Sequence, residues 1–111
     1  MTIYKSETVL DAITIMVCEH FQISRFDLKS PKSIQPLPLA RQLVAWIARK
    51  CGQTNSAIEK FLSRSKGWAI KSVQHVSGYL STDAKLMRKA TLLYVGVAAA
   101  LFPGQPIILF P

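Results

Sequence analysis

Residues 61–73, with the sequence FLSRSKGWAIKSV, place three cations, a glycine and a tryptophan between apolar residues at both ends. The apolar residues on either side recur at helical spacing, whereas the polar centre is typical of a tight turn. We expect one helix from Thr54 or Asn55, a turn at Ser63 and Arg64, and a second helix capped by Ser65. The residues expected to be buried are Ile58, Phe61 and Leu62 in the first helix and Ile70, Val73, Ser77 and Leu80 in the second. The stretch therefore predicts a helix-turn-helix whose second helix begins with exposed basic residues.

The rest of the chain also has helical periodicity, and no segment alternates long enough to predict a sheet. We expect helices that open at Ser6, at a cap on Ser24, at Pro38 and at Asp83, the last running to about Phe102. The prolines between residues 29 and 38 predict an irregular loop. The predicted fold class is all-α, a helix-turn-helix bundle of about five to six helices in one domain over residues 1–111. Its core is expected over about 6–80, with an apolar C-terminal helix and an extended tail over 83–111.

The 14 Lys and Arg residues outnumber the 6 Asp and Glu residues, and the charge is unevenly distributed. Residues 1–28 hold two cations against four carboxylates, whereas residues 29–71 hold nine cations against Glu59 alone. Clustered Lys and Arg favour a polyanionic partner, because contacts with phosphates release condensed counterions. A basic face that only keeps the protein in solution is the alternative interpretation.

The sequence does not indicate catalysis or metal binding. Cys18 and Cys51 have no CxxC partner, so we expect reduced thiols, no metal and no cofactor. His20 and His75 have no carboxylate at ligand spacing, and no nucleophile motif accompanies the serines, so we expect neither an enzyme nor a small-molecule substrate. The N-terminus lacks the apolar core of a secretion signal, and the apolar run 90–102 is shorter than a bilayer-spanning helix. A cytoplasmic protein is therefore expected, and association of its cations and apolar tail with an anionic membrane surface is a third, less favoured alternative.

Three segments carry a family resemblance: ITIMVCEHFQISRFDLKS at residues 13–30, ARQLVAWIARK at 40–50, and the helix pair that follows. Together they resemble the C-terminal DNA-binding domain (domain IV) of the DnaA replication initiator, a helix-turn-helix of the Trp-repressor-like superfamily. The resemblance covers residues 13 to about 80 and rests on Ile13, Val17, Glu19, Phe21, Ile23, Asp27, Leu28, Ser30, Arg41 and Gln42. It implies that Arg41 and Arg49 hold DNA phosphates and that a basic loop enters the minor groove. At the family's loop arginine this chain has Ser33, with Lys32 beside it.

The chain departs from that family in its recognition turn. The family signature GGRDHTTV is replaced by SRSKGWAI at residues 63–70, which retains an arginine, Arg64, but lacks the Asp, His and Thr that read bases. No GxxxxGK[ST] motif occurs, so the initiator's nucleotide-dependent activity is not expected. The resemblance therefore implies a standalone DNA-binding domain with a different target sequence.

The expected function is sequence-directed binding of double-stranded DNA that regulates transcription or replication, in a protein of the kind that phages and mobile elements carry. The expected base contacts are Arg64, Ser65, Lys66, Gly67 and Trp68. The expected phosphate contacts are Lys29, Lys32, Ser33, Arg41, Arg49 and Lys71. Trp68 either stacks on DNA or closes the core, whereas Trp46 is expected in the core.

The C-terminal segment suggests a second kind of contact, because no charged residue occurs from Thr91 to Pro111. We expect its apolar residues to bury against the domain or against a second copy in a homodimer. These residues are Leu92, Leu93, Val95, Val97, Leu101, Phe102, Ile107, Ile108, Leu109 and Phe110. The alternative function is a protein-interaction module or inhibitor that uses the same scaffold and this tail to bind a protein partner.

Overall fold

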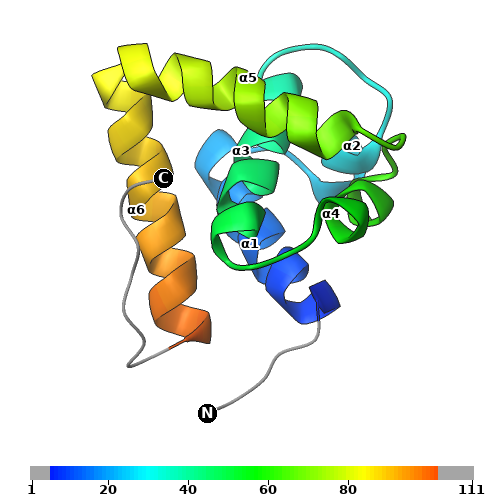
Figure 1. Ribbon diagram of the computed structural model, residues 1–111, viewed down its shortest axis with the longest axis horizontal. Helices are drawn as coiled ribbons and strands as arrows, with labels where there is room; N and C mark the ends of the chain where they lie inside the picture. Colours follow the sequence, from blue (N-terminus) through cyan, green and yellow to red (C-terminus); the bar gives the residue numbers. More distant parts are fainter. Residues whose placement is uncertain (1–5, 103–111) are drawn as a thin grey trace.

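The computed structural model describes residues 6–102, and this part of the chain forms six α-helices without a β-strand (Figure 1). The helices are α1 (Ser6–Phe21), α2 (Arg25–Lys29), α3 (Leu37–Lys50), α4 (Asn55–Leu62), α5 (Trp68–Thr82) and α6 (Ala84–Leu101). The expected all-α class and the expected number of helices are confirmed.

Three helices begin where a side-chain oxygen can accept from a backbone N–H group of the first turn. Ser24 Oγ accepts from the Asp27 N–H at 3.0 Å, and Thr54 Oγ1 accepts from the Ala57 N–H at 3.1 Å. Asp83 caps α6 in the same way. These caps were visible in the sequence because each requires only residues three positions apart.

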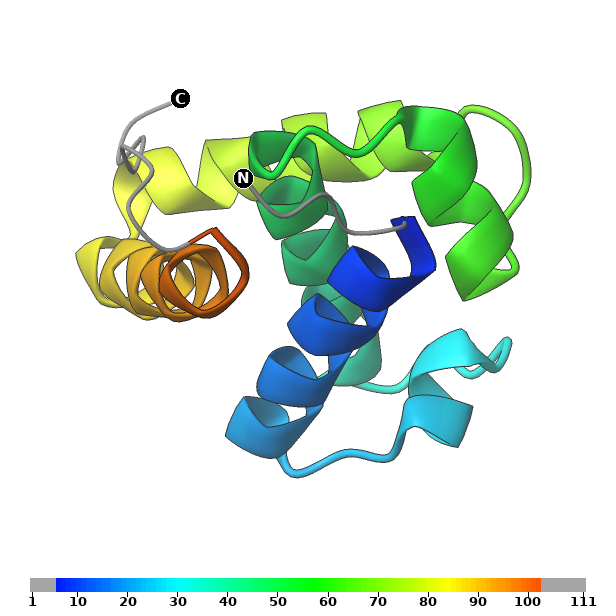
Figure 2. The ribbon, with the colours of Figure 1, turned by 90° about the horizontal axis from the view of Figure 1, so that it is seen from below.

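The central helix α3 is buried on almost every side and has α1 and α5 packed against it (Figure 2). Its fully buried apolar residues include Leu43, Val44 and Ile47. One apolar cluster collects side chains from all six helices, so α3 serves as the surface on which the others pack. The expected core position of Trp46 is confirmed: it is buried, with its ring edge-on to Tyr94 at a centroid distance of 6.5 Å.

The last helix, α6, folds back against α1 and α3 (Figure 1). Leu93, Val97 and Leu101 are buried against this chain's own helices. Val95 and Phe102 are half-buried, whereas Leu92 is 71% exposed. Of the residues expected to form an interface, Ile107 to Phe110 lie outside the described range.

The structure corrects two helix starts and one helix register. The third helix begins at Leu37, one residue before Pro38, and α5 begins at Trp68 rather than after Ser65. The buried residues of α5 are Ala69, Ser72, Val76 and Leu80, whereas Ile70 is 51% exposed. Of the other residues expected to be buried, Leu80 is buried and Val73 and Ser77 are half-buried. The cause of the later start lies at the junction of α4 and α5.

Candidate nucleic-acid interface

The junction between α4 and α5 is organised by a buried carboxylate. Glu59 is 7% exposed, and its Oε2 accepts from the N–H groups of Gly67 and Ala69, both at 2.9 Å. Ser63 ends α4 in the left-handed conformation with φ 57°, and Gly67 precedes α5 with φ 92°. Because Glu59 supplies the cap, α5 starts after Gly67. The positive end of the α5 dipole is thus already matched by a charge from inside the protein.

Arg64 was expected to reach DNA bases, but its side chain turns toward the protein. One terminal nitrogen donates to the carbonyl oxygen of Ser30 and lies 3.5 Å from that of Leu28. Nε is buried without a hydrogen-bond partner, and burial lowers the pKa of the guanidinium. Arg64 therefore ties the turn to the end of α2, and this geometry does not support its expected role in base contact.

Arg41 was expected to hold a DNA phosphate, but it is 4% exposed. Its guanidinium donates to the carbonyl oxygens of Leu28 at 2.6 Å, Lys32 at 2.5 Å, Asp27 at 3.0 Å and Ser30 at 2.8 Å. Burial, and then the positive charge of Arg64, lower the pKa of Arg41. In this structure four of the N–H donors of Arg41 are used inside the protein, and this geometry does not support its expected phosphate contact.

Arg41 and Arg64 both bind backbone carbonyl groups at the end of α2 and just after it. A five-residue helix leaves most of its C-terminal carbonyl groups without an intrahelical partner. Arg41 donates to the carbonyls of Asp27 and Leu28 in α2, and both Arg41 and Arg64 donate to that of Ser30 just after it, so residues 27–32 are fixed against α3 and the turn. One sequence signal indicated the burial of Arg41. It shares a helical stripe with Leu37, Val44 and Ala48, all of which are buried.

The other cations of residues 29–71 remain largely available to a partner. Six of them are exposed, namely Lys29, Lys32, Arg49, Lys60, Lys66 and Lys71, and Lys50 is half-buried. The ammonium of Lys29 lies 4.0 Å from the centroid of the Phe61 ring, which brings the end of α2 beside α4. Lys32 pairs with Asp27 at 3.2 Å, and Arg49 donates to the Gln53 carbonyl at 2.7 Å.

The remaining expected contact residues divide between surface and core. Ser33 and Ser65 are exposed, as is Lys66. Trp68 is half-buried and packs against the apolar cluster, so the alternative in which it closes the core is the one that the structure favours. Gly67 contributes a backbone conformation that only glycine adopts readily, and its N–H is already bonded to Glu59.

Sequence reasoning missed the outward face of α5. Its exposed residues are Ile70, Lys71, Gln74, His75, Gly78, Tyr79, Ser81 and Thr82, none of which is acidic. The rings of His75 and Tyr79 stack edge to face at 5.0 Å between centroids. The expected buried face included Ile70, which is exposed, in place of Ala69, which is buried. The spacing of Ala69, Val76 and Leu80 was the signal for the correct register.

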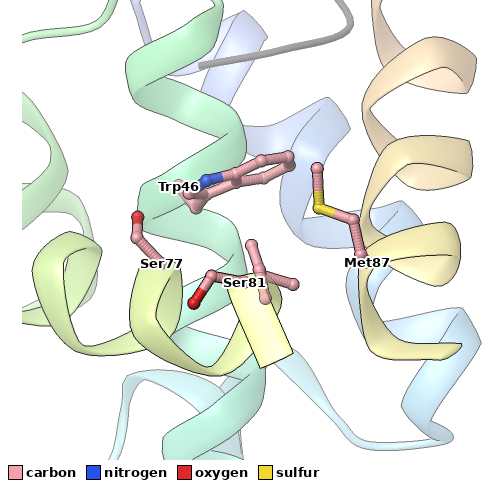
Figure 3. A pocket seen from close by; sticks show the side chains of 5 residues that line it. Trp46, Ser77, Ser81 and Met87 are labelled. Atoms are coloured by element: carbon pink, nitrogen blue, oxygen red, sulfur yellow. The ribbon is translucent and has the colours of Figure 1, made fainter. Parts of the chain in front are cut away.

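A small apolar hollow of about 130 Å³ lies between α3, α5 and α6. Figure 3 shows the Trp46 indole extending from α3 toward the thioether of Met87 on α6, with Ser77 and Ser81 on α5 beside it. No charged side chain lines this hollow. It therefore offers packing to a small apolar group but no charge that would orient a polar ligand.

Within residues 6–102, no group of three or more His, Cys, Asp or Glu side chains is placed to hold a metal ion. No helix among these residues has both the length and the apolar character needed to cross a bilayer. Both cysteine thiols are free, and burial raises the pKa of Cys18 and that of Cys51, the latter to about 11.

No protein-family model matches this chain, and neither a curated protein nor a solved structure matches it. The likeness to the DNA-binding domain of the DnaA initiator therefore rests on the sequence pattern alone. The likeness remains a prediction. The structural observation that stands beside it is the exposure of six cations in residues 29–71.

Proposed function

We propose that this protein binds double-stranded DNA through α4, the turn at residues 63–67 and α5, which act together as a helix-turn-helix. The observation that carries the proposal is the segregation of charge in residues 29–71. Six of the nine cations are exposed, whereas Glu59, the only carboxylate, is buried as a helix cap. Residues 29–71 thus keep most of their cations in solvent and bury their single carboxylate, a distribution that is complementary to the phosphate backbone, and the nearby Asp27 is paired with Lys32.

In this proposal the cations near the turn bind phosphates and α5 enters the major groove. The phosphate contacts are assigned to Lys29, Lys32, Arg49, Lys66 and Lys71. Arg41 and Arg64 act indirectly, because they hold the segment that carries Lys29 and Lys32 against the helix pair. Ser33 and Ser65 are exposed beside these cations and are assigned to supporting hydrogen bonds with the backbone.

The biological role that fits this activity is regulation of transcription or replication by site binding. The resemblance to the DnaA domain supports the role, and the replaced recognition signature supports a target different from that of the initiator. A phage or mobile-element source and a cytoplasmic location belong to the same proposal.

Fluorescence anisotropy with a labelled random-sequence duplex, measured across a salt series, tests the proposal. For the five assigned phosphate contacts, log Kobs is expected to fall with log salt at a slope of about −4 to −5. Lys66→Ala and Lys71→Ala are each expected to reduce the slope by about 1. Lys89→Ala is the matched control, because Lys89 is an exposed lysine on α6. Binding that is absent at low salt, or that is insensitive to salt, would refute the proposal.

A second candidate function, binding of a protein partner, is favoured by one apolar surface. Phe26 is 80% exposed on α2, and Ile34 is 74% exposed in the loop that follows. The neighbouring cations are partly neutralised, since Arg25 pairs with Asp11 at 3.4 Å and Lys32 pairs with Asp27. Sedimentation velocity of the wild type and of Phe26→Ala tests whether this surface joins two copies. Self-association that Phe26→Ala abolishes would favour this candidate, and a monomer at all concentrations would exclude a homodimer.

A further inference from the structure

We infer that the outward face of α5 reads base pairs directly and selects an A·T-containing site, with Gln74 as the adenine contact and Ile70 against a thymine methyl group. This inference rests on the proposed function and adds its sequence specificity. It also replaces the expected base contacts at residues 64–68, of which Arg64 is engaged inside the protein and Gly67 is engaged with Glu59.

The geometry of the face fits a groove. Ile70, Gln74 and Gly78 are spaced four residues apart and therefore form one stripe along the helix, and all three are exposed. An α-helix with its side chains is about 10–12 Å across, which matches the roughly 12 Å width of the major groove. The stripe from Ile70 to Gly78 runs about 12 Å along the helix axis and can therefore lie along one groove.

The chemistry of the stripe favours A·T pairs. The amide of Gln74 offers a donor and an acceptor together, which matches the N7 acceptor and the N6 donor of adenine. Ile70 is a β-branched apolar side chain left 51% exposed on a helix that has a buried face of its own. Against a thymine methyl group it loses that exposure, whereas no comparable apolar group exists on a G·C pair.

Gly78 provides an independent observation. A Cβ atom built at this position would have no neighbour within 4 Å, and the backbone there is not in the left-handed region. The fold therefore does not require glycine at a place where alanine would favour the helix. The missing side chain instead lets a second backbone approach α5 closely, as a DNA strand does in a groove.

The charges around the stripe agree with a nucleic-acid occupant. Lys71 lies next to Ile70 on the exposed face, and Lys66 precedes the helix, so two cations flank the part of α5 that would enter the groove. Along α5 itself no acidic side chain is present to repel phosphates. Asp83, which follows α5, is engaged as the cap of α6.

Selection from a random duplex pool tests the inference, with the wild type, Gln74→Ala and Gln74→Glu carried in parallel. The wild type is expected to enrich a site that contains A·T pairs. Gln74→Ala is expected to lose about tenfold discrimination at one base pair and to keep the preference at the others. Gln74→Glu is expected to change the preferred base at that pair to cytosine, whose N4 amino group donates to a carboxylate. Melting curves check the fold, which neither substitution should disturb because Gln74 is exposed.

Two further variants sharpen the result. Lys71→Ala is expected to weaken all sequences alike and to leave the selected site unchanged. Gly78→Ala is expected to raise the melting temperature and to lower the affinity for the selected duplex at least severalfold. Gly78→Ala binding as tightly as the wild type would overturn the close approach on which the inference depends.

The outcomes separate the inference from the proposed function. A selected site that both Gln74 variants leave unchanged, or wild-type binding without any sequence preference, overturns the inference while DNA binding stands. No duplex retained at low salt, by a protein that melts cooperatively, overturns the proposed function and the inference with it.

Discussion

Substitution of Glu59 tests whether its carboxylate caps the N-terminus of α5. Its carboxylate Oε2 accepts from the N–H groups of Gly67 and Ala69, and the residue is almost wholly buried. Glu59→Gln keeps an oxygen acceptor of nearly the same shape and removes the charge. Glu59→Ala removes the acceptor altogether.

The expected magnitudes follow from these two hydrogen bonds. In Glu59→Gln the charge-assisted bonds become neutral ones and the favourable interaction with the helix dipole is lost, a cost of about 1–2 kcal/mol in unfolding free energy. In Glu59→Ala the buried N–H group of Ala69 and the partly buried N–H group of Gly67 lose their acceptor, at about 1–3 kcal/mol each, so a total of about 2–6 kcal/mol is expected. For a domain of this size, 1 kcal/mol corresponds to a shift of roughly 4 °C in Tm.

Urea unfolding followed by circular dichroism measures both variants, with Glu19→Gln as the matched control. Glu19 is an exposed glutamate on α1, so its substitution is expected to stay within about 0.5 kcal/mol of the wild type. The expected order of stability is wild type, then Glu59→Gln, then Glu59→Ala, with an unchanged m-value. Glu59→Ala within 1 kcal/mol of the wild type would refute the capping role that the structure assigns to this carboxylate.

Four further predictions concern the stability changes on substitution of Arg41, Gly96 and Ser63 and the reactivity of the Cys51 thiol. Arg41→Met removes one donor from each of four carbonyl groups, of which that of Ser30 keeps Arg64 and that of Asp27 keeps Ser30 as donors. It is expected to lower the unfolding free energy by about 2–4 kcal/mol in urea titrations, a loss that Arg41→Lys recovers only in part. Gly96→Val is expected to cost about 1–3 kcal/mol in the same assay, because a Cβ atom would lie 2.6 Å from Cε of Met16; no loss would mean that the thioether moves aside freely. Ser63→Gly is expected to raise Tm by relieving a φ of 57°, worth up to about 1 kcal/mol. The thiol of Cys51, whose pKa burial raises from 9.0 to about 11, is expected to react with iodoacetamide about 100-fold more slowly at pH 8 in the native protein than in urea, and equal rates would contradict its burial.

Local patterns in the sequence determined the helices. The caps at Ser24, Thr54 and Asp83, and the burial of Ile58 and Leu62 in α4, were predictable because each depends on residues three or four positions apart. The concentration of cations in residues 29–71 was likewise visible, since charge needs no structure to be counted. These features establish an all-helical chain with one strongly basic region.

Tertiary structure alone decided which charged residues face solvent. Glu59 acts on N–H groups eight and ten residues away, and Arg64 acts on a carbonyl 34 residues away, so neither partnership leaves a periodic signal. The sequence shows that a side chain is charged. It does not show that the hydrogen-bonding atoms of that side chain will be bound by backbone groups elsewhere in the fold. Arg41 and Arg64 thus became internal donors, and the start of α5 moved to Trp68, because unpaired backbone groups at helix ends must find partners when they are buried.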